Sequence, residues 1–352
     1  MKNIAIVIPS LSAGGAEKQA ALLAVTLQKS YHVDIFLLHG IDSISPQNRA
    51  LLEGSDVAVH ALCGTMLFKL CQLRRELKRR GVDVLFNYLT SCNVVGAIAG
   101  RMAGVKRIYG GIRNTRVEWS KMVADRFIHN HVATGSIYNC YSGAEYFTSK
   151  GYKATRNIVI PNCFMNIAEP MVRADREVKH IVTVGRFVPQ KDYRTLIRTI
   201  ASLRALRKEF VVDIVGYGEQ EQNIVAWINE FGVEDSVNIY IKPDNVQDIL
   251  RDADIYLSTS LFEGTSNSIM EAMNWSLPVV ATDVGDNSHL IADGVSGMLH
   301  PIGDAEGMAQ SLARLIDSAD MRNSMGANGN NNLHENYTME LFEQRYVDLI
   351  ES

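Results

Sequence analysis

Residues 259–285, TSLFEGTSNSIMEAMNWSLPVVATDVG, carry the most informative pattern in this sequence. The preceding apolar run at 255–260 predicts a buried strand, and residues 264–268 predict a polar loop. From Ile269 onward, apolar side chains recur at offsets of three and four, which predicts a helix. Residues 279–282 predict a second strand. The stretch therefore reads as a strand–loop–helix unit of an α/β sheet, followed by the next strand.

Two carboxylates stand in this unit, Glu263 before the loop and Glu271 in the helix, with seven residues between them. The first turn of a helix leaves backbone N–H groups unpaired and attracts a phosphate. Glu271 would then accept the two hydroxyls of a ribose, while Glu263 would lie nearer the sugar of a nucleotide-sugar. The candidate donor-binding residues of this unit are Glu271 and the loop residues Thr265, Ser266, Asn267 and Ser268.

A structural role for the second carboxylate remains an alternative. Ser268 and Glu271 have the spacing of a capping box, in which a serine and a glutamate satisfy the first N–H groups of a helix. The residues alone do not decide between a ribose ligand and a cap.

The stretch resembles the E-x7-E signature of retaining glycosyltransferases with the GT-B fold, in particular glycosyltransferase family 4. The likeness continues through LPVVATDVG at 277–285 and IADGVSGML at 291–299, and it is densest from 181 to 301. It implies an α/β protein with two Rossmann-like domains that face each other across a deep cleft.

The length of 352 residues suggests two domains, each with its own core. We expect an N-terminal acceptor domain at 1–164 and a C-terminal nucleotide-sugar domain at 165–336. The irregular segment 163–179 predicts the linker. By resemblance, a C-terminal helix at about 337–352 packs back on the first domain.

The opening of the chain repeats the strand–loop–helix pattern. A buried strand leads to Gly14 and Gly15 and then to an amphipathic helix, so backbone N–H groups could reach an anion. In the resembled family this loop touches the diphosphate from across the cleft; a simple tight turn is the alternative. The loop lacks G-x-G-x-x-G, which disfavours an NAD oxidoreductase.

The second half restarts with a strand at 180–186. Arg186 and Lys191 flank the loop that follows it, so both cations could converge on a diphosphate and stabilise it as it leaves. The resemblance assigns them this role, and surface cations are the alternative. Gly216, in a glycine turn after the next strand, is a further donor-binding candidate.

Arg113 and Asn114 follow the fifth predicted strand, where many family members have a histidine that holds the donor sugar. They are candidates for an acceptor or a phosphate. His129 and His131 could be a metal pair, but no third ligand has a suitable spacing, and alternation along a strand would explain them. We therefore expect no metal site.

The net charge of −4 is unevenly distributed. Residues 1–165 carry 20 basic and 10 acidic side chains, and residues 166–352 carry 15 and 29. The predicted helix 67–80, LFKLCQLRRELKRR, has leucines 67, 70, 73 and 77 on one stripe and basic side chains elsewhere. Leu67–Arg80 could rest on an anionic membrane; alternatively, the stripe packs on the sheet and the basic face is solvated.

The five cysteines form no C-x-x-C pair, and we interpret them as reduced thiols. The apolar runs are shorter than the roughly 20 residues of a spanning helix, and no signal peptide is visible. We expect a cytoplasmic protein that contacts the inner face of the cytoplasmic membrane and binds no nucleic acid.

The resemblance implies a retaining glycosyltransferase that needs no cofactor. It would move a sugar from a nucleotide-sugar, with a UDP-sugar favoured, to a saccharide or lipid-linked acceptor in bacterial surface-polysaccharide synthesis. Glu263 would bind the sugar and steady positive charge at its anomeric carbon, with Arg186 and Lys191 in place of a metal ion. The alternatives are a GT-B-fold sugar-nucleotide epimerase and a non-catalytic nucleotide-sugar binder.

Overall fold

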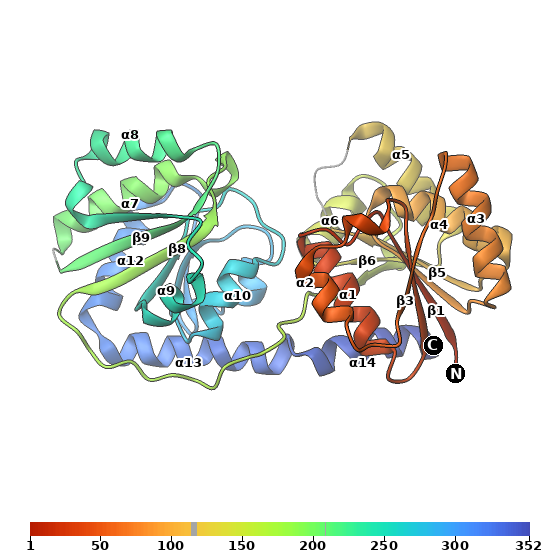
Figure 1. Cartoon of the computed structure of the whole chain (residues 1–352). Coiled ribbons are helices and arrows are strands. Elements are labelled where there is room, and N and C mark those ends of the chain that lie inside the picture. Colours follow the sequence, from red (N-terminus) through yellow and green to blue (C-terminus); the bar gives the residue numbers. More distant parts are fainter. Residues whose placement is uncertain (114–117, 208) are drawn as a thin grey trace. The chain divides into compact units, whose positions relative to one another are not determined.

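The computed structural model describes residues 1–113, 118–207 and 209–352, and it divides into two compact units (Figure 1). Unit 1 comprises Met1–Cys163 and Met339–Ser352, and unit 2 comprises Phe164–Thr338. The division after Cys163 lies one residue from the predicted domain change at 164/165. Both units are parallel sheets with helices on both faces, which is the predicted α/β class.

Unit 1 contains a seven-stranded parallel sheet in the order β3-β2-β1-β4-β5-β6-β7. Alternate residues of the central strand enter opposite cores, with Ile4 and Ile6 on one face and Ala5 and Val7 on the other. Burial on both faces explains the continuous apolar sequence of this strand. The strands are β1 Asn3–Ile8, β2 His32–Leu37, β3 Ala58–Ala61, β4 Val84–Asn87, β5 Arg107–Ile112, β6 Gly135–Tyr138 and β7 Asn157–Val159.

The helices of unit 1 form two layers. The α1 and α14 helices bury apolar side chains in the core on one face, and α3 and α4 bury theirs on the other (Figure 1). The helices are α1 Gly15–Leu27, α2 Pro46–Leu52, α3 Met66–Arg79, α4 Thr90–Ala103, α5 Trp119–Phe127, α6 Tyr141–Ser149 and α14 Met339–Glu351.

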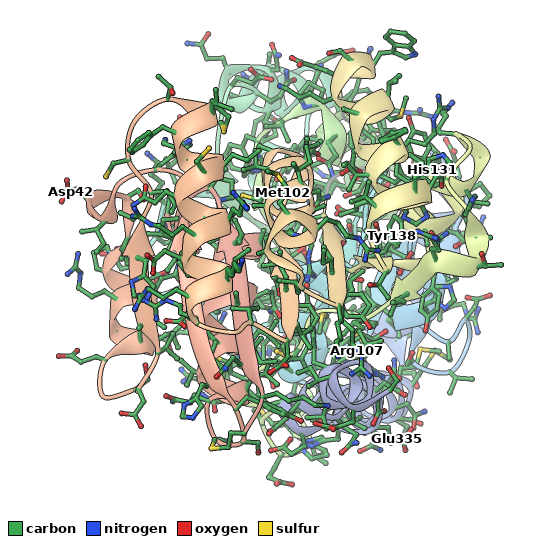
Figure 2. The ribbon with its side chains drawn as sticks, turned by 90° about the vertical axis from the view of Figure 1, so that its right-hand side faces the viewer. Asp42, Met102, Arg107, His131, Tyr138 and Glu335 are labelled. Carbon is green, nitrogen blue, oxygen red and sulfur yellow. The ribbon has the colours of Figure 1, made fainter. Side chains whose placement is uncertain are left out.

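The last helix, α14, belongs to unit 1 although it follows unit 2 in the sequence. Its Phe342, Tyr346 and Ile350 are buried in the same core as α1. Arg107, at the start of β5, donates a hydrogen bond to the carbonyl of Ile350 (Figure 2). These contacts explain why a chain end that is distant in sequence is ordered on this sheet.

Unit 2 contains a six-stranded parallel sheet in the order β10-β9-β8-β11-β12-β13. The chain builds outward from β8 to β10 and then returns to the other side of β8 with β11. The strand order therefore reverses between β8 and β11. The strands are β8 Lys179–Arg186, β9 Phe210–Tyr217, β10 Val237–Ile241, β11 Ile255–Ser258, β12 Val279–Thr282 and β13 Gly297–His300.

The helices of unit 2 also cover both faces of its sheet. The α7, α8 and α12 helices bury one face, and α9 and α10 bury the other (Figure 1). The helices are α7 Tyr193–Leu206, α8 Glu221–Phe231, α9 Val246–Asp252, α10 Asn267–Asn274, α11 Asn287–Leu290, α12 Ala305–Asp317 and α13 Ala319–Asn336.

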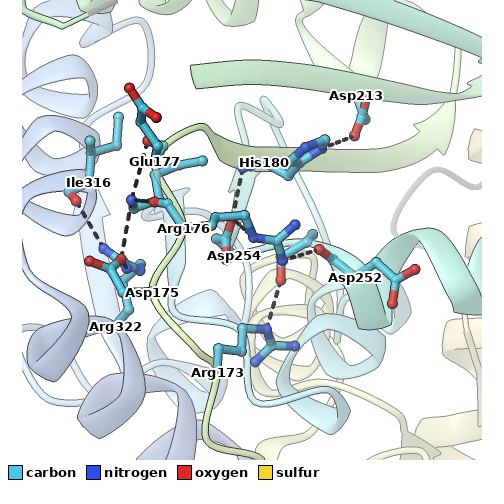
Figure 3. Close-up of polar contacts among 12 residues, drawn as sticks. Arg173, Asp175, Arg176, Glu177, His180, Asp213, Asp252, Asp254, Ile316 and Arg322 are labelled. Atoms are coloured by element: carbon cyan, nitrogen blue, oxygen red, sulfur yellow. Dashed lines mark hydrogen bonds and ion pairs between the residues drawn. The ribbon is translucent and has the colours of Figure 1, made fainter. Parts of the chain in front are cut away.

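The segment predicted as a linker is bound to unit 2 (Figure 3). Arg173 donates to the carbonyls of Ala253 and Ser276 at 2.7 and 2.9 Å. Arg176 pairs with the buried Asp254 at 3.2 Å, and Asp175 pairs with Arg322 (Figure 3). These ion pairs and hydrogen bonds tie residues 173–176 to unit 2 although the segment has no regular secondary structure.

Several elements of unit 1 were not predicted, among them α2, α5 and the turn Ile128–Val132. The α2 helix begins at Pro46, whose preceding Ser45 caps it by accepting the Asn48 N–H at 3.3 Å. The interpretation of His129 and His131 as strand residues is wrong, because both lie in the π-helical turn Ile128–Val132 that follows α5. Neither α2 nor this turn has the apolar periodicity from which helices were inferred.

Candidate functional site

The carboxyl ends of β8 and β11 bring several predicted residues of unit 2 together. Arg186 is the last residue of β8, and Glu263 follows β11 by five positions. Lys191 ends the short 3₁₀ helix Pro189–Lys191 that follows β8. In open parallel sheets, ligands bind outside the carboxyl ends of strands where the strand order reverses. This edge of unit 2 is therefore its candidate site.

Lys191 and Glu263 form an ion pair at this edge. The Nζ of Lys191 lies 2.6 Å from Oε1 of Glu263, and their side chains are only 18% and 10% exposed. The residues are 72 positions apart, so the pair depends on the tertiary fold. The fold thus brings two of the predicted site residues into direct contact.

Backbone contacts hold the two partners of this ion pair in place. Thr259 Oγ1 donates to the carbonyl of Lys191 at 2.9 Å. The Leu261 N–H donates to the carbonyl of Gln190 at 2.8 Å, and the Gln190 side chain donates to the carbonyl of Phe262 at 2.7 Å. The loop after β8 and the loop after β11 are thus joined directly, which limits how far the ion pair can separate.

Both carboxylates of the E-x7-E pattern lie near one buried phenol, Tyr256 of β11. Burial raises the pKa of Tyr256, and the negative charges of Glu271 and Glu263 raise it further. Its hydroxyl donates to the carbonyl of Val184 at 3.2 Å. Both carboxylates therefore lie close enough to Tyr256 to act electrostatically on its hydroxyl.

The loop residues predicted to bind the donor lie at the start of α10. The helix begins at Asn267, and its N-cap residue Ser266 makes no capping hydrogen bond with its side chain. Ser268 is the second helical residue, so the capping-box alternative for Glu271 is wrong. Thr265 and Ser266 are buried, whereas Asn267 is exposed. The Ser266 side chain therefore does not occupy the first N–H groups of α10.

Arg186 contributes an exposed cation to the same edge. Its side chain makes no ion pair or hydrogen bond with any residue in the described part of the chain. Lys191 is neutralised by Glu263, so Arg186 supplies net positive charge beside the pair. This arrangement suits a ligand with more than one negative charge.

The glycines of β8 and β9 allow close packing beneath the site. A Cβ on Gly216 would lie 1.9 Å from the carbonyl oxygen of Gly185, its partner across the two strands. A Cβ on Gly185 would lie 3.1 Å from Cε of Lys191. Gly216 is therefore required for strand packing, and Gly185 provides the surface on which the Lys191 side chain rests.

In unit 1, the glycine loop lies between β1 and α1, as expected. Gly15 is the first residue of α1, and Gly14 is its N-cap. The N–H of Gly14 already donates to the carbonyl of Ser12 at 3.0 Å. The Glu17 carboxylate lies so close that a Cβ on Gly14 would be 2.3 Å from Oε2. Any anion at this loop would have to displace Glu17.

Arg113 occupies a position inside unit 1. Its guanidinium donates to Asn162 Oδ1 at 3.0 Å and to the Tyr346 hydroxyl at 3.3 Å, and it lies 4.9 Å from the centre of the Tyr88 ring. These contacts tie α14 to the end of β5. No carboxylate within the described residues pairs with Arg113. Asn114, the companion candidate, lies outside the described residues.

His129 and His131 do not resemble a metal pair. His129 is buried, with Nδ1 2.8 Å from Ser136 Oγ and Nε2 3.1 Å from the carbonyl of Lys153. Burial lowers the pKa of His129. Outside residues 114–117 and 208, no group of three potential metal-ligating side chains occurs.

The α3 helix has two distinct surfaces. Leu73 and Leu77 are buried in the core of unit 1, and Leu70 packs partly against it. In contrast, the first turn exposes Met66, Leu67 and Phe68 by 52%, 73% and 62%. The inward-packing alternative therefore holds for most of the leucine stripe but not for Leu67.

The basic side chains of α3 differ in their pairing. Arg79 and Arg80 pair with Glu76. Arg75 and Lys78 make no ion pair within the described ranges and line a surface hollow with Phe68. None of the helices in those ranges is long and apolar enough to cross a bilayer.

Sequence reasoning missed several residues that support Glu263. Ser260 donates to its carboxylate, Thr259 and Gln190 connect the two loops, and Gly285 packs against its backbone. One signal was available: three hydroxyl residues, Ser258–Thr259–Ser260, end a buried strand, where ligand-binding groups usually gather.

Comparison with known proteins adds independent information. Residues 169–332 match the family described as glycosyl transferases group 1. The lipopolysaccharide core biosynthesis glycosyltransferase LpsE of Rhizobium meliloti is 27% identical over 172 residues, which is 49% of each chain. The chain thus spans about half the length of this relative.

A longer alignment involves an enzyme of Campylobacter jejuni, N-acetylgalactosamine-N,N'-diacetylbacillosaminyl-diphospho-undecaprenol 4-alpha-N-acetylgalactosaminyltransferase. It is 23% identical and covers 92% of both chains. Among solved structures, Anabaena Alr3699/HepE in complex with UDP has a TM-score of 0.82 at 19% identity and full coverage of both chains. This likeness shows that the chain has the two-domain GT-B fold.

Proposed function

We propose that the protein is a retaining glycosyltransferase, because residues 169–332 match the family described as glycosyl transferases group 1. It transfers a sugar from a nucleotide-sugar to a hydroxyl of an acceptor. The observation that carries the proposal is the 2.6 Å ion pair between Lys191 and Glu263 at the carboxyl edge of the unit 2 sheet. The similarity of the E-x7-E stretch to retaining enzymes supports the stereochemical outcome.

Each charged residue of this edge has a role in the proposed reaction. Arg186 and Lys191 bind the diphosphate and stabilise the charge that develops when the bond to the sugar breaks. Glu263 binds the sugar and stabilises positive charge at the anomeric carbon. Glu271 accepts the ribose hydroxyls, and the first turn of α10, with Thr265, Ser266, Asn267 and Ser268, receives a phosphate. The two cations make the transfer metal-independent, and no cofactor is required.

A UDP-sugar is the favoured donor, because HepE has been solved with UDP-glucose. We propose that the acceptor is a lipid-linked saccharide of bacterial surface-polysaccharide synthesis and binds unit 1. The description of the Campylobacter relative, whose substrate is a diphospho-undecaprenol saccharide, supports this. Gly14 and Gly15 remain candidates for a phosphate contact, and Arg113 for an acceptor contact.

A donor screen tests the proposed function. UDP-, GDP- and ADP-sugars are added in thermal unfolding experiments, and one class should stabilise the protein by about 2.7 kcal/mol at one hundred times its Kd. NMR of that donor with the enzyme, with water as the acceptor, should then show nucleotide release and a free sugar whose initial anomer has retained configuration, also in the presence of EDTA. A new nucleotide-sugar without nucleotide release would indicate the epimerase instead, and activity restored only by manganese would contradict metal independence.

We also propose that α3 binds unit 1 to the anionic lipids of the inner face of the cytoplasmic membrane. The exposed Met66, Leu67 and Phe68 form an apolar turn, and Arg75 and Lys78 carry unpaired positive charge on the same helix. Apolar burial combined with attraction to anionic lipid is how interfacial helices bind.

Vesicle flotation tests this surface. A Leu67→Glu, Phe68→Glu protein should bind phosphatidylglycerol vesicles at least about tenfold more weakly than the unchanged protein, because both apolar contacts are lost. Val225→Glu, a similarly exposed position on α8 of unit 2, is the control. Equal flotation of all three proteins would contradict the proposal. So would binding of the unchanged protein to phosphatidylcholine vesicles that is as strong as its binding to phosphatidylglycerol vesicles.

A further inference from the structure

The carboxylate of Glu263 is held through one of its two oxygens. Oε1 accepts hydrogen bonds from Lys191 Nζ at 2.6 Å and from Ser260 Oγ at 2.7 Å. No residue of the described ranges donates to Oε2. The two donors therefore fix the side chain and leave Oε2 as the oxygen that can face a ligand.

Ser260 is itself held by a chain of buried polar groups. Its carbonyl accepts a hydrogen bond from Thr282 Oγ1 at 2.6 Å, and the Thr282 carbonyl accepts one from Asn287 Nδ2 at 2.9 Å. All three residues are fully buried. Because Thr282 ends β12 and Asn287 begins α11, the backbone of Ser260 is held by two neighbouring elements.

The geometry points to Ser260 as a positioning residue for Glu263. A glutamate side chain has three rotatable bonds, and the Lys191 side chain is also long and flexible. Ser260 has one short side chain on a fixed backbone, so its hydrogen bond selects a single orientation of the carboxylate. We infer that Ser260 keeps Oε2 directed at the sugar. This inference rests on the proposed function, because it assigns Glu263 a role in transfer.

Ser260→Ala tests the inference. Removing a hydrogen bond to a charged group corresponds to about a ten- to hundredfold loss. We expect this loss in kcat for hydrolysis of UDP-glucose, in which water accepts the glucosyl group and UDP leaves. The Kd for UDP alone should change less than about twofold, because Lys191 and Arg186 remain. A general structural defect would instead weaken UDP binding as well. Ser260→Cys keeps the volume with a weaker donor and should give an intermediate kcat.

Ser136→Ala is the matched control. Ser136 is a buried serine of β6 in unit 1, and its hydroxyl lies 2.8 Å from Nδ1 of His129. Its kcat should stay within about twofold of the unchanged protein. A kcat for Ser260→Ala that equals that of the control would overturn the inference.

A double-mutant cycle distinguishes the positioning role of Ser260 from the proposed role of Glu263 in transfer. In a Glu263→Gln background, which already has low kcat, Ser260→Ala should add less than about twofold, because its effect passes through the carboxylate. A full, independent loss in that background would overturn the positioning role alone. Normal kcat in Glu263→Gln itself would remove the proposed role of Glu263, and this outcome is distinguishable from the first.

Discussion

A Lys191→Ala protein is expected to lose about 10²–10³ of its turnover while remaining folded. A group that stabilises charge developing in a transition state typically contributes this much. The ammonium lies at the carboxyl edge of the unit 2 sheet and contacts Glu263 at 2.6 Å. Removing it takes away a cation for the departing diphosphate and leaves Glu263 with Ser260 as its remaining donor. Steady-state kinetics measure the loss of turnover, and circular dichroism shows whether the variant remains folded.

Arg194→Ala provides the comparison for this prediction. Arg194 is a cation three residues further along, on α7, and it pairs with Glu230 at 3.5 Å on the surface. Exposed pairs contribute little to stability, so Arg194→Ala should have nearly normal turnover and thermal stability. Glu263→Ala should lose turnover as severely as Lys191→Ala. Normal rates in either Lys191→Ala or Glu263→Ala would refute the assigned site.

Gly285→Ala should be damaging for a steric reason. Gly285 has a positive φ of 58°, and a Cβ there would lie 2.1 Å from the carbonyl oxygen of Glu263. The backbone strain costs about 1–2 kcal/mol and the overpacking a further 1–3 kcal/mol or so. We therefore expect the free energy of unfolding to fall by about 2–5 kcal/mol. Turnover should fall as well, because the only relief is a shift of the Glu263 backbone.

Gly294→Ala separates strain from the steric clash. Gly294 also has positive φ, 73°, but no atom lies within 4 Å of where its Cβ would be. It should lose only about 1–2 kcal/mol and keep normal turnover. Urea unfolding and kinetics on both variants make the comparison. If Gly285→Ala had the same stability and turnover as Gly294→Ala, the close packing of Gly285 against Glu263 would not matter for function.

Much of the fold could be predicted from the sequence because both sheets are parallel and buried. Strands such as β1 and β12 are continuous apolar runs, and the helices between them have a clear apolar side. The α2 helix was not predicted because it is short and depends on a serine cap. Residues 173–176 read as a free linker because their partners, such as Asp254 and Arg322, lie far away in the sequence.

Those residues of the candidate site that belong to a local sequence pattern could be named from the sequence. The spacing of Glu263 and Glu271 and the position of Arg186 and Lys191 after β8 needed only the order of residues. The supporting residues were not predictable in this way, because Ser260 and Thr282 act through hydrogen bonds between neighbouring strands. The role of Gly216 in ligand approach stays a prediction, and the structure adds a packing reason for this glycine, its contact with Gly185 across the sheet.

The central claim is that the edge of unit 2 that carries Lys191 and Glu263 binds the diphosphate of a nucleotide. Calorimetric titration of UDP, GDP and ADP into the unchanged protein and into Lys191→Ala tests it most directly. One diphosphate should bind the unchanged protein, and its affinity should fall by at least about tenfold in Lys191→Ala, since a charge-assisted contact is lost. Equal affinity of the two proteins for that diphosphate would contradict the claim.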